Sequence, residues 1–75
     1  MSAMSNDERK KALMSQCSIN AEDCRGNADF AAYAFKSGDM AAAKQYVDYL
    51  ESNLRRLKSV MGSIEELERK ADHVE

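Results

Sequence analysis

The sequence of 75 residues lacks proline and lacks any long apolar run. Without proline, nothing forbids long unbroken helices. No stretch approaches the roughly 20 apolar residues of a membrane span, and residues 1–11 have no apolar run typical of a signal peptide. The net charge of −2 argues against a dedicated nucleic-acid binder and against a basic helix on a membrane surface. We therefore expect a cytoplasmic protein that does not associate with membranes.

Thiol and imidazole side chains are scarce, with two cysteines and one histidine. On a helix, Cys17 and Cys24 would lie roughly 10 Å apart along the axis, whereas a disulfide needs Cα atoms within about 7 Å. They cannot bridge each other there, although a bridge between two subunits stays open. A zinc site would need further ligands, and His73 lies at the far end of the chain. We expect two buried thiols in a reducing compartment, with no metal and no cofactor.

Motifs of catalysis are missing as well. The sequence has no glycine-rich phosphate loop, no Cys-x-x-Cys pair and no His-Glu-x-x-His motif. Asp72 and His73 are adjacent, but neighbouring residues of a helix point in different directions and chain ends fray. The acidic clusters at 22–23 and 65–68 are typical of solvated faces. We expect no catalytic residue and therefore no enzyme.

The residues that are present follow helical spacing. Ser5 and Glu8 have the spacing of a capping box, which predicts a helix that begins at residue 6. Small and apolar residues then recur at steps of three and four, at Leu13, Cys17, Ala21, Cys24, Ala28, Ala31 and Phe35. The pattern predicts a helix over residues 6–36, with residues 18–27 as a segment where it could kink or break.

Residues 37–39 predict a tight turn before a second helix over residues 40–72. Gly38 suits the left-handed position after a helix end, and Asp39 suits the N-cap of the next helix. The second helix has the alternating four-and-three spacing of a coiled-coil seam at Ala43, Val47, Leu50, Leu54, Leu57, Met61 and Ile64. So short a connection makes the helices antiparallel. The expected fold class is all-α, an antiparallel helical hairpin that forms a single domain over residues 1–75.

The turn also predicts which residues of the two helices face each other, with partner numbers that sum to about 75. This register places small side chains of the first helix opposite large ones of the second, as in the pairs Ala28–Val47 and Ala21–Leu54. It also brings the basic residues 9–11 opposite the acidic residues 65–68. The apolar and charge patterns thus agree on one fold.

Both helices carry more apolar surface than one mutual interface can bury. A chain of this size buries only about 60% of its unfolded surface and usually needs a disulfide, a metal or a partner chain for stability. Large exposed apolar patches mark interfaces, so we expect two hairpins to dimerise into a four-helix bundle. The residues expected at the interface are Ile19, Phe30, Tyr33, Tyr46, Tyr49, Val60, Ile64 and Leu67.

The segment Tyr33 to Asp39, followed by Ala43 and Tyr46, resembles the turn of one tetratricopeptide repeat over about a third of the chain. A repeat array needs at least three units, and the sequence has no second copy. The overall plan is also similar to small bacterial hairpin proteins that dimerise into four-helix bundles. Both resemblances imply a helical hairpin and assign no functional residue.

Three functional hypotheses remain. The first is a non-enzymatic interaction protein of bacterial or phage type, a homodimer that binds a larger protein as an adaptor, inhibitor or chaperone. The second is a nucleic-acid regulator that uses Arg55, Arg56 and Lys58, whose binding would weaken steeply with salt. The third is an oligomer that binds a nucleotide or another small ligand near the tyrosines, which would raise its melting temperature. The sequence identifies neither the partner nor the biological process.

Overall fold

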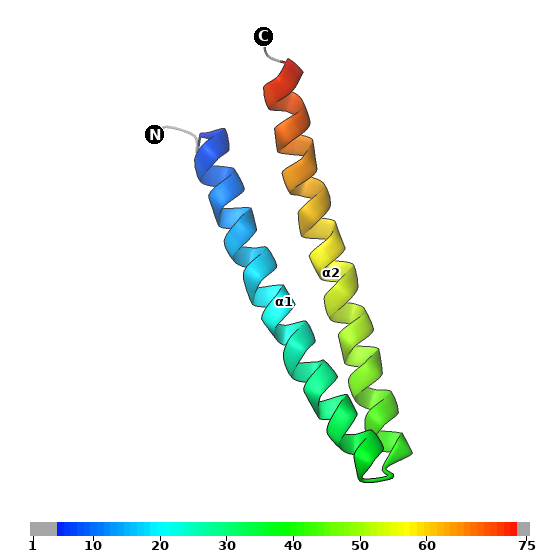
Figure 1. The fold of residues 1–75 in the computed structure, drawn as a ribbon. Helices are drawn as coiled ribbons and strands as arrows, with labels where there is room; N and C mark the ends of the chain where they lie inside the picture. Colours follow the sequence, from blue (N-terminus) through cyan, green and yellow to red (C-terminus); the bar gives the residue numbers. More distant parts are fainter. Residues whose placement is uncertain (1–4, 74–75) are drawn as a thin grey trace.

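The computed structural model describes the backbone of residues 5–73 and the side chains of residues 5–70. Two helices, α1 (Asn6–Lys36) and α2 (Met40–His73), lie side by side as an antiparallel hairpin, with the ends of the chain opposite the turn (Figure 1). The predicted all-α hairpin is therefore confirmed. The break considered for residues 18–27 does not occur, since α1 is one continuous helix over its 31 residues.

Side-chain capping explains where α1 begins. The hydroxyl oxygen of Ser5 accepts a hydrogen bond from the backbone N–H of Glu8 at 3.1 Å. The Glu8 carboxylate accepts one from the backbone N–H of Ser5 at 3.3 Å. This is the predicted capping box, and it satisfies N–H groups that have no partner within the helix.

The turn at residues 37–39 closes both helices. Gly38 has φ of 76°, the left-handed conformation that glycine adopts without steric cost. Its N–H donates to the carbonyl of Phe35, and the N–H of Asp39 donates to that of Ala34, the pattern of a Schellman motif. The Asp39 carboxylate then accepts from the N–H of Ala42 at 3.1 Å and caps α2. The turn therefore has the glycine and N-cap roles that the sequence predicted.

The contact between the helices is a heptad seam, in which buried and half-buried side chains recur at steps of three and four. We number these seam residues as heptad positions a and d. In α1 they are Leu13, Cys17, Asn20, Cys24, Asn27, Ala31 and Ala34. In α2 they are Ala43, Tyr46, Leu50, Asn53, Leu57, Val60, Ile64 and Leu67.

This seam differs from the predicted one. Val47, Leu54 and Met61 were expected to face α1, but they are 42%, 42% and 49% exposed. On α1, Ala21, Ala28 and Phe35 are likewise exposed. The reason is that α2 carries an apolar row at e beside its a and d rows, whereas one neighbouring helix covers only a and d. Each helix is rotated so that its e positions lie outside the contact.

Three contacts fix the register between the helices. The amide nitrogen of Asn27 donates to the amide oxygen of Asn53 at 2.6 Å, and the rings of Phe30 and Tyr46 stack with centroids 5.2 Å apart. Lys10 forms a 2.8 Å ion pair with Glu68, which raises the pKa of Lys10 through the hydrogen bond and the carboxylate charge. The ion pair confirms that basic residues 9–11 lie opposite acidic residues 65–68. The partner numbers of the three contacts sum to between 76 and 80, slightly more than the predicted 75.

The buried apolar core is small. Among the described side chains it comprises Ala31, Ala34, Ala43, Ile64 and Leu67. Two polar side chains, Asn20 and Asn53, are buried in the same seam. The amide nitrogen of Asn20 is buried without a hydrogen-bond partner among the described residues. Leaving a buried donor unpaired costs about 1–3 kcal/mol.

Replacing Asn20 with leucine should therefore stabilise the hairpin. Leucine has the same number and branching of side-chain heavy atoms and removes the unpaired donor, so we expect the free energy of unfolding to rise by about 1–3 kcal/mol. Urea unfolding followed by circular dichroism measures this change. A loss of stability would show that the Asn20 amide has a partner in the assembled protein.

Two helical glycines offer a second stability test. An added methyl group at Gly26 or Gly62 would meet nothing within 4 Å, and glycine inside a helix costs about 0.5–1 kcal/mol relative to alanine. Gly26→Ala and Gly62→Ala should each raise the free energy of unfolding by about that amount, measured at one fixed protein concentration. Destabilisation by Gly26→Ala alone would indicate that another molecule approaches α1 closely there.

Candidate protein-binding surfaces

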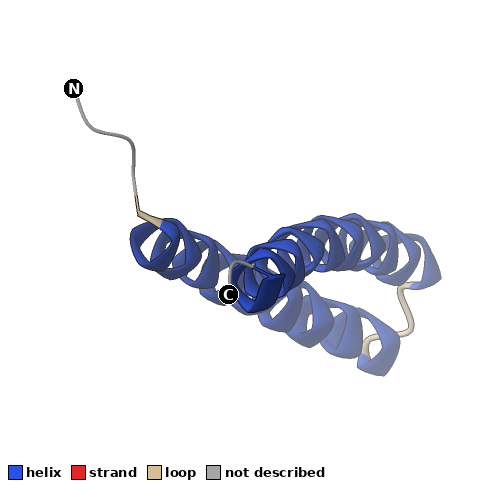
Figure 2. Ribbon diagram, turned by 90° about the horizontal axis from the view of Figure 1, so that it is seen from above, coloured by secondary structure: helices blue, strands red, loops and turns tan. Residues whose placement is uncertain are grey.

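The hairpin is a single layer of helices with two open faces. Its principal extents are 56 × 23 × 15 Å, and no third element covers either face in the part of the chain that the structure describes (Figures 1 and 2). Its radius of gyration is 17.0 Å, compared with about 11 Å for a compact domain of this length. Side chains beside the seam therefore remain at the surface.

One face carries a continuous band of apolar residues, which we call the apolar stripe. It consists of the e positions of both helices, namely Met14, Ala21, Ala28 and Phe35 of α1 and Met40, Val47, Leu54 and Met61 of α2. Residues seven apart form a straight row along a coiled-coil helix. Because e positions of antiparallel helices lie on the same side of the seam, the two rows share one face.

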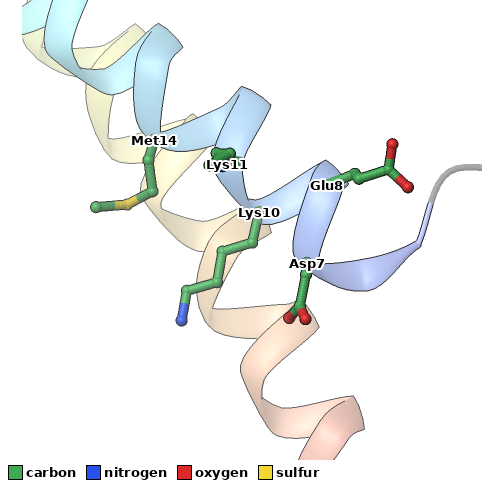
Figure 3. Close-up of a pocket in the computed structure, with 5 residues that line it drawn as sticks. All are labelled: Asp7, Glu8, Lys10, Lys11 and Met14. Carbon is green, nitrogen blue, oxygen red and sulfur yellow. The ribbon is translucent and has the colours of Figure 1, made fainter.

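A shallow groove confirms that the two rows meet. Met14, Cys17 and Ala21 of α1 line it together with Leu57, Met61 and Ile64 of α2. Lys10 and Glu68, which form the ion pair between the helices, lie at the open end of this groove. Figure 3 shows Lys10 and Met14 extending from the same side of α1, with Glu8 on the other side. The stripe therefore runs from the open end of the hairpin toward the turn.

The other face has an aromatic patch near the turn, formed by Phe30, Tyr33, Tyr46 and Tyr49. Tyr46 stacks on Phe30 and meets Tyr49 edge-on with ring centroids 6.2 Å apart. The hydroxyl oxygen of Tyr49 accepts a hydrogen bond from the Gln45 amide at 2.8 Å. A hollow between Phe30, Tyr33 and Tyr46 continues to Ala42 on α2. Phe30 and Tyr49 occupy g positions, on the opposite side of the seam from the stripe.

The residues predicted for an interface fall into two groups. Ile19, Phe30, Tyr33 and Tyr49 are exposed, by 62%, 57%, 73% and 48%, and are available to a partner. Ile64 and Leu67 are buried between the helices of one chain, and Tyr46 and Val60 are half-buried there. The latter four belong mainly to the core of the hairpin. Whether any of the eight contacts a partner stays a prediction.

The sequence reasoning missed the stripe as an outer surface. It had assigned Val47, Leu54 and Met61 to the seam and Leu67 to the outside, whereas the structure exposes the first three and buries Leu67. Ile64, which the prediction placed both in the seam and at the interface, is buried in the seam. The seven-residue spacing from Met40 to Met61 is the signal that marks the row in the sequence. The sequence alone could not say which two of the three rows α1 covers.

The basic residues proposed for nucleic-acid contact are exposed but do not form one compact patch. Arg55 lies 3.7 Å from Glu51 on its own helix, which partly offsets its charge. At about 100° per residue, Arg56 points away from Arg55 and Lys58. The side chain of His73 lies outside the described side chains.

The described residues contain neither a cluster of metal ligands nor a helix able to span a membrane. No group of three or more histidine, cysteine, aspartate or glutamate side chains in that part of the chain could hold a metal ion. Cys17 and Cys24 are free and half-buried at a positions of the seam. Neither helix, as far as the structure describes it, combines the length and apolar character that crossing a bilayer requires.

The sequence matches no protein-family model, and comparisons with curated proteins and with solved structures gave no significant match. The surfaces of the hairpin are therefore the basis for inferring its function.

Proposed function

We propose that this chain is a non-enzymatic protein–protein interaction module that acts as a homodimer of helical hairpins. One observation carries the proposal. Ten large apolar side chains are between 42% and 73% exposed, whereas the buried apolar core of the described residues has five members, three of them alanine. Burying a large apolar side chain contributes about 1.5–3 kcal/mol to stability. Most of the large apolar side chains named above remain in water in a single hairpin, so burying them against a partner would stabilise an assembly.

The target of such a dimer is a larger protein. The aromatic patch supports this part of the proposal, because tyrosine and phenylalanine are enriched at the centres of protein interfaces. A small protein of this kind would serve as an adaptor, an inhibitor or a chaperone, of bacterial or phage type. Its free thiols suit the reducing conditions of the cytoplasm.

Analytical ultracentrifugation of the wild-type protein tests the homodimer. We expect a mass of twice 8.4 kDa from low to high micromolar concentration, because association hides apolar surface that a single hairpin leaves in water. A single-chain mass throughout that range would contradict the homodimer.

Affinity capture with matched variants tests target binding. Phe30→Asp and Tyr33→Asp place charges in the aromatic patch, so proteins that the wild type retains from its native cell should be lost. Ser15→Asp, on an exposed position of α1 several turns from the patch, is the control and should retain them. Identical capture by all four proteins would contradict a target site at the patch. Binding of RNA or DNA that requires Arg55, Arg56 and Lys58 and weakens steeply with salt would favour the nucleic-acid hypothesis instead.

A further inference from the structure

The apolar stripe holds most of the large apolar side chains that one hairpin leaves exposed. It contains six of the ten large exposed apolar side chains, Met14, Phe35, Met40, Val47, Leu54 and Met61. The two rows extend along both helices, so a short peptide or a small ligand would cover only part of them. A flat partner of the same length covers them fully, and a second hairpin has that shape.

The surface area agrees with a second copy. The chain exposes 6031 Å², whereas a compact monomer of 8.4 kDa exposes roughly 4,600 Å². The excess is larger than the roughly 800 Å² per partner that a stable protein interface buries. One hairpin therefore has enough surplus surface to form a dimer interface of ordinary size.

Two arrangements with two-fold symmetry bring stripe against stripe. If the axis runs along the helices, both turns lie at the same end and α1 of each copy packs against α2 of the other. If the axis runs across them, the turns lie at opposite ends and each helix packs against its own copy. Both arrangements bury the same apolar residues, so the charges at the border of the stripe must decide between them.

The border charges occupy the b positions, directly outside the stripe. They are Lys11 and Arg25 on α1 and Lys44, Glu51, Lys58 and Glu65 on α2. With the axis along the helices, Lys11 lies level with the second copy's Glu65, and Arg25 lies level with the second copy's Glu51. If the axis runs across the helices, Arg25 lies level with the middle of the stripe residues of α1. It then meets the second copy's Arg25. Opposite charges favour a pairing geometry and like charges disfavour it.

We propose that a second copy of this chain covers the apolar stripe, with both turns at the same end and each α1 packed against the second copy's α2. This inference rests on the homodimer proposed above and adds its interface and orientation. The aromatic patches lie on the opposite faces, so both stay uncovered at one end of the bundle. The dimer thus presents two copies of the target-binding surface together.

Distance measurement between two spin labels tests the orientation. The label is attached to Lys36→Cys, at an exposed position beside the turn, in a chain with Cys17→Ala and Cys24→Ala. Circular dichroism verifies that this variant remains helical. Turns at the same end place the labels at a separation on the scale of the 23 Å width. Turns at opposite ends, with the axis at the level of Arg25, place them roughly 33 Å apart along the helices. A dimer with the long distance would overturn the orientation and leave the homodimer standing, and a monomeric wild type would overturn both.

Charge substitution tests which face is covered. Leu54→Glu places a charge in the stripe and should weaken dimerisation by about tenfold or more. Ile19→Glu is the matched control on the other side of α1, exposed by 62%, and should change it by less than about threefold. Loss of the dimer with Ile19→Glu but not with Leu54→Glu would overturn the assignment of the interface.

Charge reversal across the interface gives an independent test. Neither Lys11 nor Glu65 forms an ion pair within the described part of the chain, so each is available to the second copy. Lys11→Glu and Glu65→Lys should each weaken the dimer about two- to fivefold at low salt, and the double variant should recover the wild-type affinity. A double variant weaker than either single one would overturn the proposed pairing.

Discussion

Two helices of a hairpin share only one interface. Each helix of the hairpin can place two rows of side chains, a and d, against the other. The second helix nevertheless carries a third apolar row, at Met40, Val47, Leu54 and Met61. Whichever two rows form the seam, the remaining one faces water. The exposed stripe is therefore a consequence of the sequence itself, and no rotation of the helices could remove it.

Polar residues determine which row is left outside. Asn27 and Asn53 form a hydrogen bond across the seam, and Asn20 is buried in the same contact. Asparagine in a coiled-coil seam lowers stability but specifies the register. Here the α1 side of the seam consists mostly of alanine, cysteine and asparagine, and the larger apolar residues of the seam come from α2. The seam thus packs small or polar side chains of α1 against larger apolar ones of α2, and the e row of α2 remains exposed.

The ends of the helices could be predicted from the sequence because their causes are local. Ser5 with Glu8, and Gly38 with Asp39, interact with backbone groups a few residues away, so spacing alone identifies them. The rotation of the helices could not be predicted in this way. A search for apolar spacing passes over Asn20 and Asn27, although both occupy the seam. Because the apolar pattern passed over these two residues, it placed Leu54 in the seam and Leu67 outside it. The sequence therefore indicated surplus apolar surface correctly but assigned part of that surface to the wrong row.

The central claim is that the exposed apolar surface is covered by a second copy in the working protein. Small-angle X-ray scattering of the wild-type chain in solution tests it most directly, because the mass and the longest dimension come from one sample. We expect a particle of twice 8.4 kDa whose length stays close to the 56 Å of one hairpin. A particle with the mass of a single chain would contradict it.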